Sequence, residues 1–437
     1  MKKLLGRHVS EKQPFRWNIS PIPVFVSVGI IALCVLLCCF LFSHGTLISQ
    51  YFYDDLRDTG MDFFHSIEYV RGKAPYELFD TLYPPLANLM FYAFYHMIPP
   101  DISNHWTNDF FESIIMRGTQ FDLRTYQAPL LLFLLFVLLT GWMLVSLCTS
   151  CLKRDSNYHV NTVAFCMLFS PGILYALERG NILLLVIPLT LFFVMYRNSE
   201  NKLLQELALI ALALAAGMKL YPAFFGVLLI RDKKYAQAIR AIAYGVLSVI
   251  LPVLFFNEGL AGIPMWLSVV FNFGGSAHSP WGGVSFADIL HRLASYANRS
   301  WGIAVDSSLF APVSAVGCGI LLIASLGYKK EWQSILSITV AVIAFQSQAS
   351  YIFGFMCIPL LLFLAQEKKL ESGNILPFLL MLLLTVHLPL FNKRTDITIK
   401  QLILLLLTCW CVITAAAACI QKKKTIRSNK HNGNMEN

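Results

Sequence analysis

The sequence has few charged residues for its length. Of its 437 residues, 14% are Asp, Glu, Lys or Arg, whereas 57% are hydrophobic and the mean hydropathy is +0.61. An ordinary soluble domain of this length does not need so much apolar sequence to fill its core. This composition excludes a soluble protein and predicts an all-α polytopic membrane protein.

The sequence also lacks a continuous basic segment, although its formal net charge is +9. Its basic residues occur as short clusters at the ends of apolar segments, an arrangement that orients membrane helices and is not typical of nucleic-acid binding. We therefore expect membrane lipids around the protein and no nucleic-acid partner.

Signs of disulfides and of a structural metal site are missing as well. All 11 cysteines lie in or at the ends of apolar segments, where Cys acts as a small hydrophobic residue. The pair Cys148 and Cys151 has CxxC spacing, but no second pair completes a zinc site. We expect no disulfide framework and no cofactor.

The N-terminal apolar run has no small-residue cleavage site close behind it, so it does not resemble a cleavable signal. Basic residues before it, including Lys2 and Lys3, predict a cytoplasmic N-terminus. Every later basic turn can be cytoplasmic at the same time; these turns lie near 153–154, 197–202, 231–234, 329–330, 368–369 and 422–424. The protein is then a multi-pass cell-membrane protein with both termini cytoplasmic, and Arg179, Lys219 and the loop 257–306 face the opposite side.

Apolar segments predict about twelve transmembrane helices between residues 23 and 420. We expect them near 23–43, 128–152, 160–177, 181–197, 203–218, 220–230, 236–256, 308–327, 333–346, 350–366, 375–391 and 398–420. Two are shorter than the roughly 20 residues that a full crossing needs. Residues 1–22 form a cytoplasmic tail, external loops lie near 44–127 and 257–306, and residues 421–437 form a disordered cytoplasmic tail.

If the apolar run 83–98 is counted as one crossing, every later turn changes to the opposite side of the membrane, and the basic turns are no longer cytoplasmic. We therefore interpret it as an interfacial or re-entrant helix along the outer face, within the first external loop. The alternative is that it crosses, and that a second crossing lies between Phe110 and Thr140.

Asp62 is the leading candidate for a catalytic group. It is followed by apolar residues at helical spacing, which predicts a helix that starts near Thr59 on the membrane surface and carries Asp62 in its first turn. The N-terminus of a helix stabilises a carboxylate, which suits a general base. Asp58, one turn earlier, is the alternative, and solvation accounts for the other acidic residues of the loop.

Three short motifs on the same side could bind a substrate. Tyr83 and the two prolines after it start a helix. Glu178, Arg179 and Asn181 lie in a tight connection, where the two charges either compensate each other or leave Arg179 to bind an anion. Lys219 and Tyr221 interrupt an apolar stretch, so Lys219 either snorkels or faces a cavity.

The loop 257–306 supplies weaker candidates. It combines aromatic residues, glycines and charges of both signs, as a carbohydrate-facing surface would. His278 and Arg292 are its candidate ligand-binding residues, although a single histidine in a loop is more often structural or solvated.

Together these motifs resemble glycosyltransferase family 87 of the glycosyltransferase-C superfamily. The resemblance covers roughly Asp62 to Lys234 and rests on the order of the following motifs: Asp62, the turn Gly72–Tyr76, Tyr83–Leu86, Glu178–Asn181 and Lys219–Pro222. It implies a glycosyltransferase-C-like membrane bundle that uses polyprenyl-phosphate-linked sugars, typically mannose. Family members often carry Asn-Gln-Ser-Leu followed by Arg in a late external loop; Gly282–Phe286 with Arg292 is a degenerate version, which leaves the donor sugar and the acceptor undefined.

The resemblance also implies an inverting transfer. Asp62 would deprotonate the acceptor hydroxyl, and Arg179 and Lys219 would bind the donor phosphate. Asp58, Tyr83, Glu178, Asn181, Tyr221, His278 and Arg292 are the expected substrate-binding residues. The first loop has no DxD motif, so we expect no obligatory metal.

The hypothesis is thus a membrane hexosyltransferase that moves a sugar from a polyprenyl-phosphate donor to a glycan or glycolipid acceptor at the extracytoplasmic face. Two other classes remain open. A lipid-linked-sugar flippase or transporter would also have broken helices at a cavity. A polysaccharide polymerase or ligase would rely on a large late external loop, which 257–306 could provide.

Overall fold

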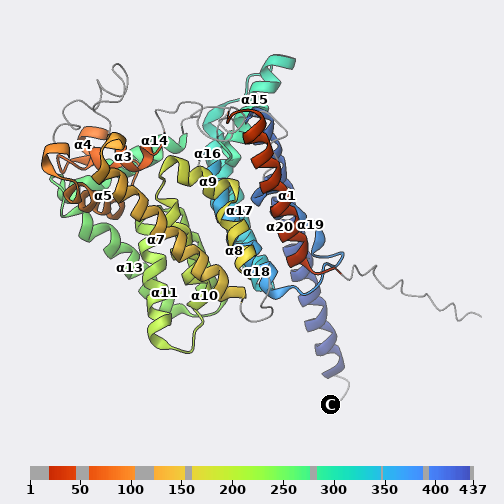
Figure 1. The fold of residues 1–437 in the computed structure, drawn as a ribbon. Coiled ribbons are helices and arrows are strands. Elements are labelled where there is room, and N and C mark those ends of the chain that lie inside the picture. Colours follow the sequence, from red (N-terminus) through yellow and green to blue (C-terminus); the bar gives the residue numbers. More distant parts are fainter. Residues whose placement is uncertain are drawn as a thin grey trace, which may run out of the picture.

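The computed structural model of the protein is helical throughout the part of the chain that it describes (Figure 1). The described residues are 19–45, 59–103, 123–152, 160–275, 283–345, 348–386 and 393–433. Within these ranges the regular elements are α-helices and short 3₁₀ helices. The prediction of an all-α protein is confirmed.

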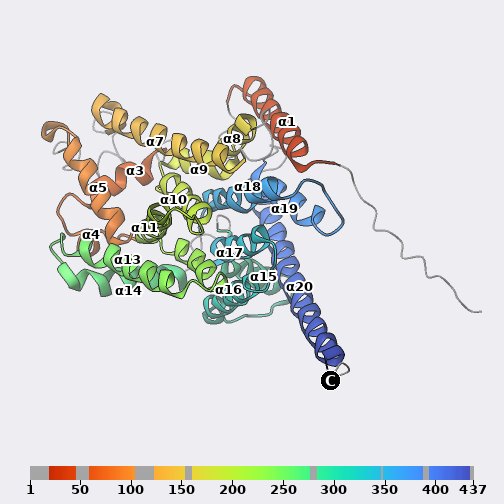
Figure 2. The same ribbon diagram turned by 90° about the horizontal axis from the view of Figure 1, so that it is seen from below.

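Most helices run side by side and form one bundle (Figures 1 and 2). Its α-helices are α1 (Pro21–Phe42), α7 (Gln127–Leu152), α8 (Val160–Leu168), α9 (Pro171–Arg179), α10 (Leu183–Tyr196), α11 (Lys202–Met218), α12 (Val227–Arg231), α13 (Tyr235–Val253), α16 (Phe310–Ser325), α17 (Glu331–Phe345), α18 (Cys357–Gln366), α19 (Ile375–Thr385) and α20 (Lys393–Gly433). Five 3₁₀ helices interrupt or connect the α-helices: η4 (Leu123–Thr125), η5 (Tyr221–Gly226), η6 (Gly259–Ala261), η7 (Ser307–Leu309) and η8 (Ser350–Met356).

Shorter helices gather at one end of the bundle, the upper end in Figure 1. They are α3 (Met61–Tyr69), α4 (Pro75–Phe79), α5 (Pro85–Met97), α14 (Gly262–Gly275) and α15 (Phe286–Trp301). With 13 residues, α5 is too short for a full crossing at about 1.5 Å per residue, and it packs on α3, α11 and α13.

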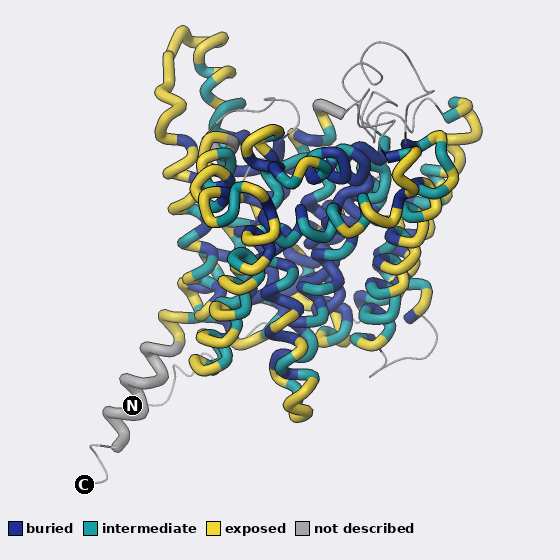
Figure 3. Tube along the Cα trace, turned by 90° about the vertical axis from the view of Figure 1, so that its left-hand side faces the viewer, coloured by how far each residue is buried: buried dark blue, intermediate teal, exposed yellow. Residues whose placement is uncertain are grey.

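The described helices include five that are long and apolar enough to cross a membrane, or up to six if the bent pair α8 and α9 counts as one span. This supports a polytopic membrane protein, whereas the expected number of about twelve crossings stays a prediction. The long helices are the peripheral ones: at most 28% of their most apolar window is buried inside the protein. By contrast, nearly all of α17 and α18 is buried, and Figure 3 shows buried residues concentrated in the centre of the bundle.

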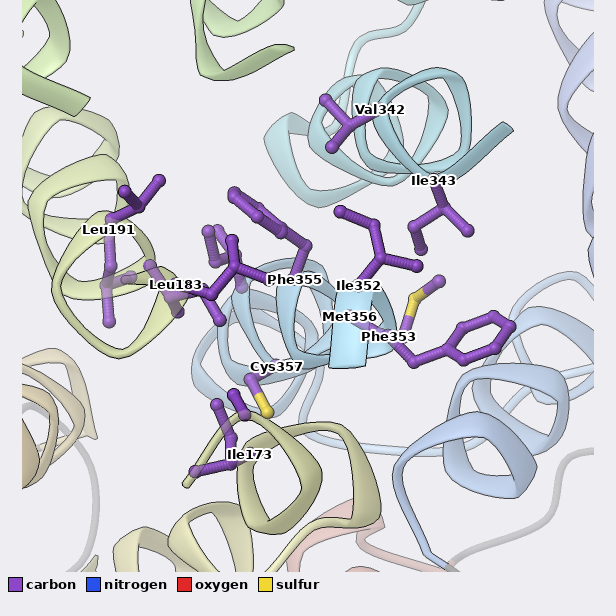
Figure 4. Packing of buried hydrophobic residues seen from close by; sticks show 14 of the residues in the cluster. Ile173, Leu183, Leu191, Val342, Ile343, Ile352, Phe353, Phe355, Met356 and Cys357 are labelled. Carbon is purple, nitrogen blue, oxygen red and sulfur yellow. The ribbon is translucent and has the colours of Figure 1, made fainter. Parts of the chain in front are cut away.

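The centre of the bundle is held by a close approach between α9 and η8. A Cβ atom at Gly172 would lie 2.3 Å from the backbone nitrogen of Gly354, so the two backbones touch where neither residue has a side chain. Such approaches between small residues are typical of helix packing in membranes. Figure 4 shows η8 surrounded by apolar side chains of its neighbours, including Ile173 of α9, Leu183 of α10 and Val342 of α17.

The segment predicted to form the first external loop is attached to the connection between α13 and α14. Glu258 accepts hydrogen bonds from the backbone N–H of Tyr76, at 3.0 Å, and of Glu77, at 3.2 Å, at the start of α4. The backbone N–H of Asn257 donates to the carbonyl of Lys73 at 2.7 Å. Segments from both predicted external loops therefore lie at the same end of the bundle.

The C-terminal helix is longer than expected. α20 continues to Gly433, so residues 421–433 are helical in the structure, although their polar sequence predicts disorder. Lys, Gln and Arg are good helix formers, which lets a helix propagate beyond the end of its apolar part.

Candidate active site

The candidate site begins at the first turn of α3. Gly60 is the N-cap with φ 75°, so α3 begins at Met61, close to the expected start near Thr59, and Asp62 lies in its first turn. The backbone N–H of Gly60 donates to the carbonyl of Glu178 at 2.7 Å, and the hydroxyl of Thr59 donates to the Glu178 carboxylate at 3.0 Å. The start of α3 is therefore attached to the end of α9.

A second glycine allows this approach. Gly180 is the C-cap of α9 with φ 65°, and a Cβ atom there would lie 2.8 Å from the Cβ of Phe63 and 3.2 Å from the carbonyl oxygen of Gly60. Both the left-handed backbone and the crowding favour glycine. The turn that contains Glu178 and Arg179 can pack against α3 because residues 60 and 180 lack side chains.

This packing brings Asp62 between two donors. One carboxylate oxygen accepts from Arg179 Nη2 at 2.6 Å, and the other accepts from Asn181 Nδ2 at 2.6 Å. Asn181 is buried, and its Oδ1 accepts the backbone N–H of Leu183 at 3.0 Å, which fixes the orientation of its amide. Charge-assisted hydrogen bonds to both oxygens hold the carboxylate in a single orientation.

Tyr83 lies next to this group and is held by its backbone. Its carbonyl accepts from the Tyr76 hydroxyl at 3.1 Å and from Asn88 Nδ2 at 3.3 Å, just before the prolines that start α5. Burial raises the pKa of Tyr83, and the Asp62 carboxylate adds to the rise. Tyr83 and Asp62 therefore share one electrostatic environment.

Lys219 approaches from the break between α11 and η5, outside both helices. Its Nζ lies 4.5 Å from the centre of the Tyr83 ring, a cation–π contact. It forms no ion pair with any residue that the structure describes. Burial lowers the pKa of Lys219 to about 8, while the Asp62 carboxylate opposes this shift. Lys219 is therefore a half-buried cation that contacts an aromatic ring and pairs with no carboxylate among the described residues.

Tyr221, at the start of η5, has a buried hydroxyl that finds no hydrogen-bond partner in the described part of the chain. Its side chain is 3% exposed and its ring packs edge-on against Phe355 at 5.6 Å. Buried hydroxyl groups in proteins are nearly always hydrogen-bonded, so this one is suited to a ligand.

The second half of α3 carries another acid, Glu68. Burial raises the pKa of Glu68 to about 8, although Arg71 opposes the rise. Burial also raises the pKa of Tyr69, and Asp62 contributes. At neutral pH the Glu68 carboxyl is therefore largely protonated.

Residues 82–345 match the sequence model of glycosyltransferase family 87. The match covers more than half of the chain. This chain belongs to glycosyltransferase family 87. The resemblance found in the sequence motifs is confirmed, and the protein is a membrane glycosyltransferase. A search of curated proteins found no match.

The limits of the family match differ from the expected ones. It begins after Asp62 and continues far beyond Lys234, where the resemblance was expected to weaken. Tyr83, Arg179, Asn181 and Lys219 lie inside it. Asp62 lies outside the matched segment. Its hydrogen bonds with Arg179 and Asn181, which lie inside the segment, connect it to the family match.

Of the expected substrate-binding residues, the structure places Arg292 away from this group. Arg292 lies on α15, where its Nη1 donates to the hydroxyl of Thr398 at 2.7 Å, and Figures 1 and 2 show α15 well away from α3. Glu178 accepts hydrogen bonds from Thr59 and Gly60, so it holds the turn. Asp58 and His278 lie outside the described residues. The described residues contain no group of three His, Cys, Asp or Glu side chains that could hold a metal ion.

Two contributors to the site were not predicted. Gly60 comes directly before the helical pattern of α3, and this position could have marked it as a cap. Tyr351, on η8, interacts electrostatically with Tyr83. No local sequence signal distinguishes it from the other aromatic residues of the apolar segments.

Proposed function

We propose that this family 87 protein transfers a sugar, mannose, from a polyprenyl-phosphate donor to a glycan or glycolipid acceptor, with inversion at the anomeric carbon. The observation that supports this most is the contact of Asp62 with Arg179 and Asn181, beside Lys219, a cation without a carboxylate partner in the described chain.

Asp62 is the proposed general base. It accepts the proton of an acceptor hydroxyl while that oxygen bonds to the anomeric carbon of the donor. The bond between the anomeric carbon and the phosphate oxygen breaks, and polyprenyl phosphate leaves with the bonding electrons. Attack from the face opposite the leaving group inverts the configuration.

The two cations have different roles in this proposal. Arg179 was expected to bind the donor phosphate, but its 2.6 Å ion pair makes orienting Asp62 its first role. Lys219 is the principal phosphate ligand, because its charge is matched by no carboxylate in the described residues. A cation near the leaving phosphate stabilises the charge that develops there in the transition state.

The topology follows from the charges at the two ends of the bundle. The basic turns after α10, before α17 and after α18 lie at the end opposite Asp62 (Figure 1). By the positive-inside rule that end is cytoplasmic, which puts both termini in the cytoplasm and Asp62 at the extracytoplasmic face of a bundle of about twelve crossings.

The experiment is a transfer assay with purified protein, synthetic polyprenyl-phosphate sugars and, in parallel, polyprenyl-diphosphate oligosaccharides. We expect transfer from polyprenyl-phosphate mannose and a loss of about 10²- to 10⁴-fold in Asp62→Asn, the range for removal of a general base. Asp80→Asn is the matched control, because Asp80 is an exposed acid in the same loop. It should keep full activity.

Two results would contradict the proposal in different ways. Full activity of Asp62→Asn would remove Asp62 from the role of base. Transfer from the diphosphate oligosaccharide alone would indicate a polymerase or ligase.

A further inference from the structure

A set of three tyrosines, Tyr83, Tyr221 and Tyr351, lies beside the Asp62–Arg179 pair. We call it the tyrosine cluster. Its members come from three elements far apart in the sequence: the segment before α5, the start of η5 and η8. Tyr351 lies beyond residue 345, where the family match ends, so the match assigns it no role.

Tyr351 is held rigidly by the core. The residues after it on η8, including Ile352 and Phe353, are buried among apolar side chains (Figure 4), and Gly354 touches the backbone of α9 at Gly172. Its ring packs against Tyr175 of α9 at 5.7 Å, and its hydroxyl donates to Gln348 Oε1 at 3.1 Å. A hydroxyl that donates one hydrogen bond can still accept another.

The hydroxyl of Tyr221 contributes the observation that points to a ligand. It is buried, with its side chain 3% exposed, and it has no hydrogen-bond partner among the residues that the structure describes. Such a hydroxyl has hydrogen-bonding capacity that a ligand can use.

Each of the three tyrosines interacts electrostatically with the other two, and the ring of Tyr221 packs at 5.6 Å against Phe355 of η8, the helix that carries Tyr351. The groups that act electrostatically on Tyr83 are Asp62, Tyr351, Tyr221 and Arg179, and Lys219 lies over its ring. Asp62 and Arg179 neutralise each other as an ion pair. The proposed function assigns the Lys219 cation to the donor phosphate. The remaining groups around Tyr83 are the uncharged hydroxyls of Tyr221 and Tyr351, which suit a substrate portion that is itself uncharged and rich in hydroxyl groups.

We propose that the tyrosine cluster binds the sugar of the donor, with the hydroxyls of Tyr221 and Tyr351 hydrogen-bonded to sugar hydroxyls, and that it selects a neutral hexose over a uronic acid or an amino sugar. This inference rests on the proposed function. It assigns Tyr351 a role in substrate specificity and places the sugar between Asp62 and η8.

The test compares Tyr221→Phe and Tyr351→Phe with the unchanged protein, using polyprenyl-phosphate mannose and its single-deoxy analogues. Each variant keeps its ring and loses one hydroxyl. We expect kcat/KM for mannose to fall about five- to tenfold, as for one lost hydrogen bond to a neutral group. For one deoxy analogue per variant the loss should disappear, because the analogue lacks the hydroxyl that the tyrosine binds.

The control is Tyr244→Phe, whose hydroxyl is hydrogen-bonded to Glu206 between α11 and α13. It should match the unchanged protein with every donor. Thermal unfolding in detergent identifies any variant that loses activity through instability. A donor with glucuronic acid or an amino sugar should be used at least tenfold less well than mannose.

The outcomes separate this inference from the proposed function. If the unchanged protein transfers mannose and both phenylalanine variants show equal losses on every donor, or none, the tyrosine cluster does not bind the sugar. Equal use of a uronic acid donor would overturn the selection of a neutral sugar. If the unchanged protein uses no polyprenyl-phosphate sugar, the proposed function fails first, and this inference with it.

Discussion

The two ends of the bundle each contain an arginine paired with carboxylates, but the two arginines differ in what surrounds them. At the lower end in Figure 1, Arg197 is 1% exposed and donates to Asp232 at 3.1 Å, to Glu331 at 2.5 Å and to the carbonyl of Val194. At the upper end, Arg179 and Asp62 retain 14% and 18% exposure of their side chains.

The surroundings of the two groups differ further. The Arg197 group is linked to more hydrogen bonds, since Asn198 also donates to Asp232 and Gln366 donates to Glu331. Beside the Asp62 group lie Tyr221, whose hydroxyl has no hydrogen-bond partner in the described chain, and the cation Lys219. A closed polar network stabilises a fold, whereas an open one can bind a substrate. The Arg197 group therefore holds helices together, and the Asp62 group is the one that we propose carries the chemistry.

The largest effect should come from removing Arg197. Arg197→Met removes the buried cation that Asp232 and Glu331 share. Their side chains are 15% and 32% exposed, and Asp232 keeps Arg231 at 3.4 Å, so we expect the free energy of unfolding to fall by about 3 kcal/mol, the low end for breaking a buried pair. Thermal or denaturant unfolding in detergent measures this. Arg240→Met is the control: its ion pair with Glu206 is 46% and 31% exposed, so it should cost less than about 1 kcal/mol. A stable but inactive Arg197→Met would contradict the division of roles.

A smaller effect on stability and a larger one on activity should follow from Gly180→Ala. The new Cβ would lie 2.8 Å from Phe63, and the backbone has φ 65°, so we expect a loss of about 1–3 kcal/mol in stability. Displacing the turn also moves Arg179 and Asn181 from Asp62, which should lower kcat by roughly tenfold or more. Gly302→Ala is a matched control, since Gly302 has φ 67° and no atom within 4 Å of its added Cβ. Equal losses of activity in both variants would rule out the displacement.

The smallest effect is a pH dependence set by Lys219. Because burial lowers the pKa of Lys219 to about 8, it is charged below that pH and neutral above it. We expect kcat/KM for the donor to fall about tenfold per pH unit above pH 8, since this parameter reports the free enzyme. In Lys219→Arg the side chain stays charged, so this fall should vanish. A decline of the same size in both proteins would assign it to another group.

Sequence reasoning succeeded where a local pattern determines the structure. The apolar run expected near 128–152 forms α7 from Gln127 to Leu152, and the helix expected near Thr59 begins at Met61. The break at Lys219 lies between α11 and η5 as the interruption of the apolar sequence predicts. In these cases the deciding residues are neighbours in the chain.

It failed where contacts join distant residues. Arg197 belongs to a basic turn that the charge rule assigns to solvent, yet it is buried, because Asp232 and Glu331 come from other helices. Asp62 and Arg179 were expected at one site, but the ion pair between them, across 117 residues, was not predicted, because it depends on Gly60 and Gly180 packing together. The close contact of α9 with η8 likewise could not be predicted, because neither segment's own sequence indicates its partner.

The contact between α3 and the turn after α9 also has a consequence for biosynthesis. Asp62 is translated and inserted long before Arg179 and Asn181, which follow it by 117 and 119 residues. A nascent chain that has delivered only the segment before α7 carries the acid without the side chains that orient it. Under the proposed mechanism, catalytic competence therefore arises late in membrane insertion, and a truncated chain that stops before Asn181 is inactive.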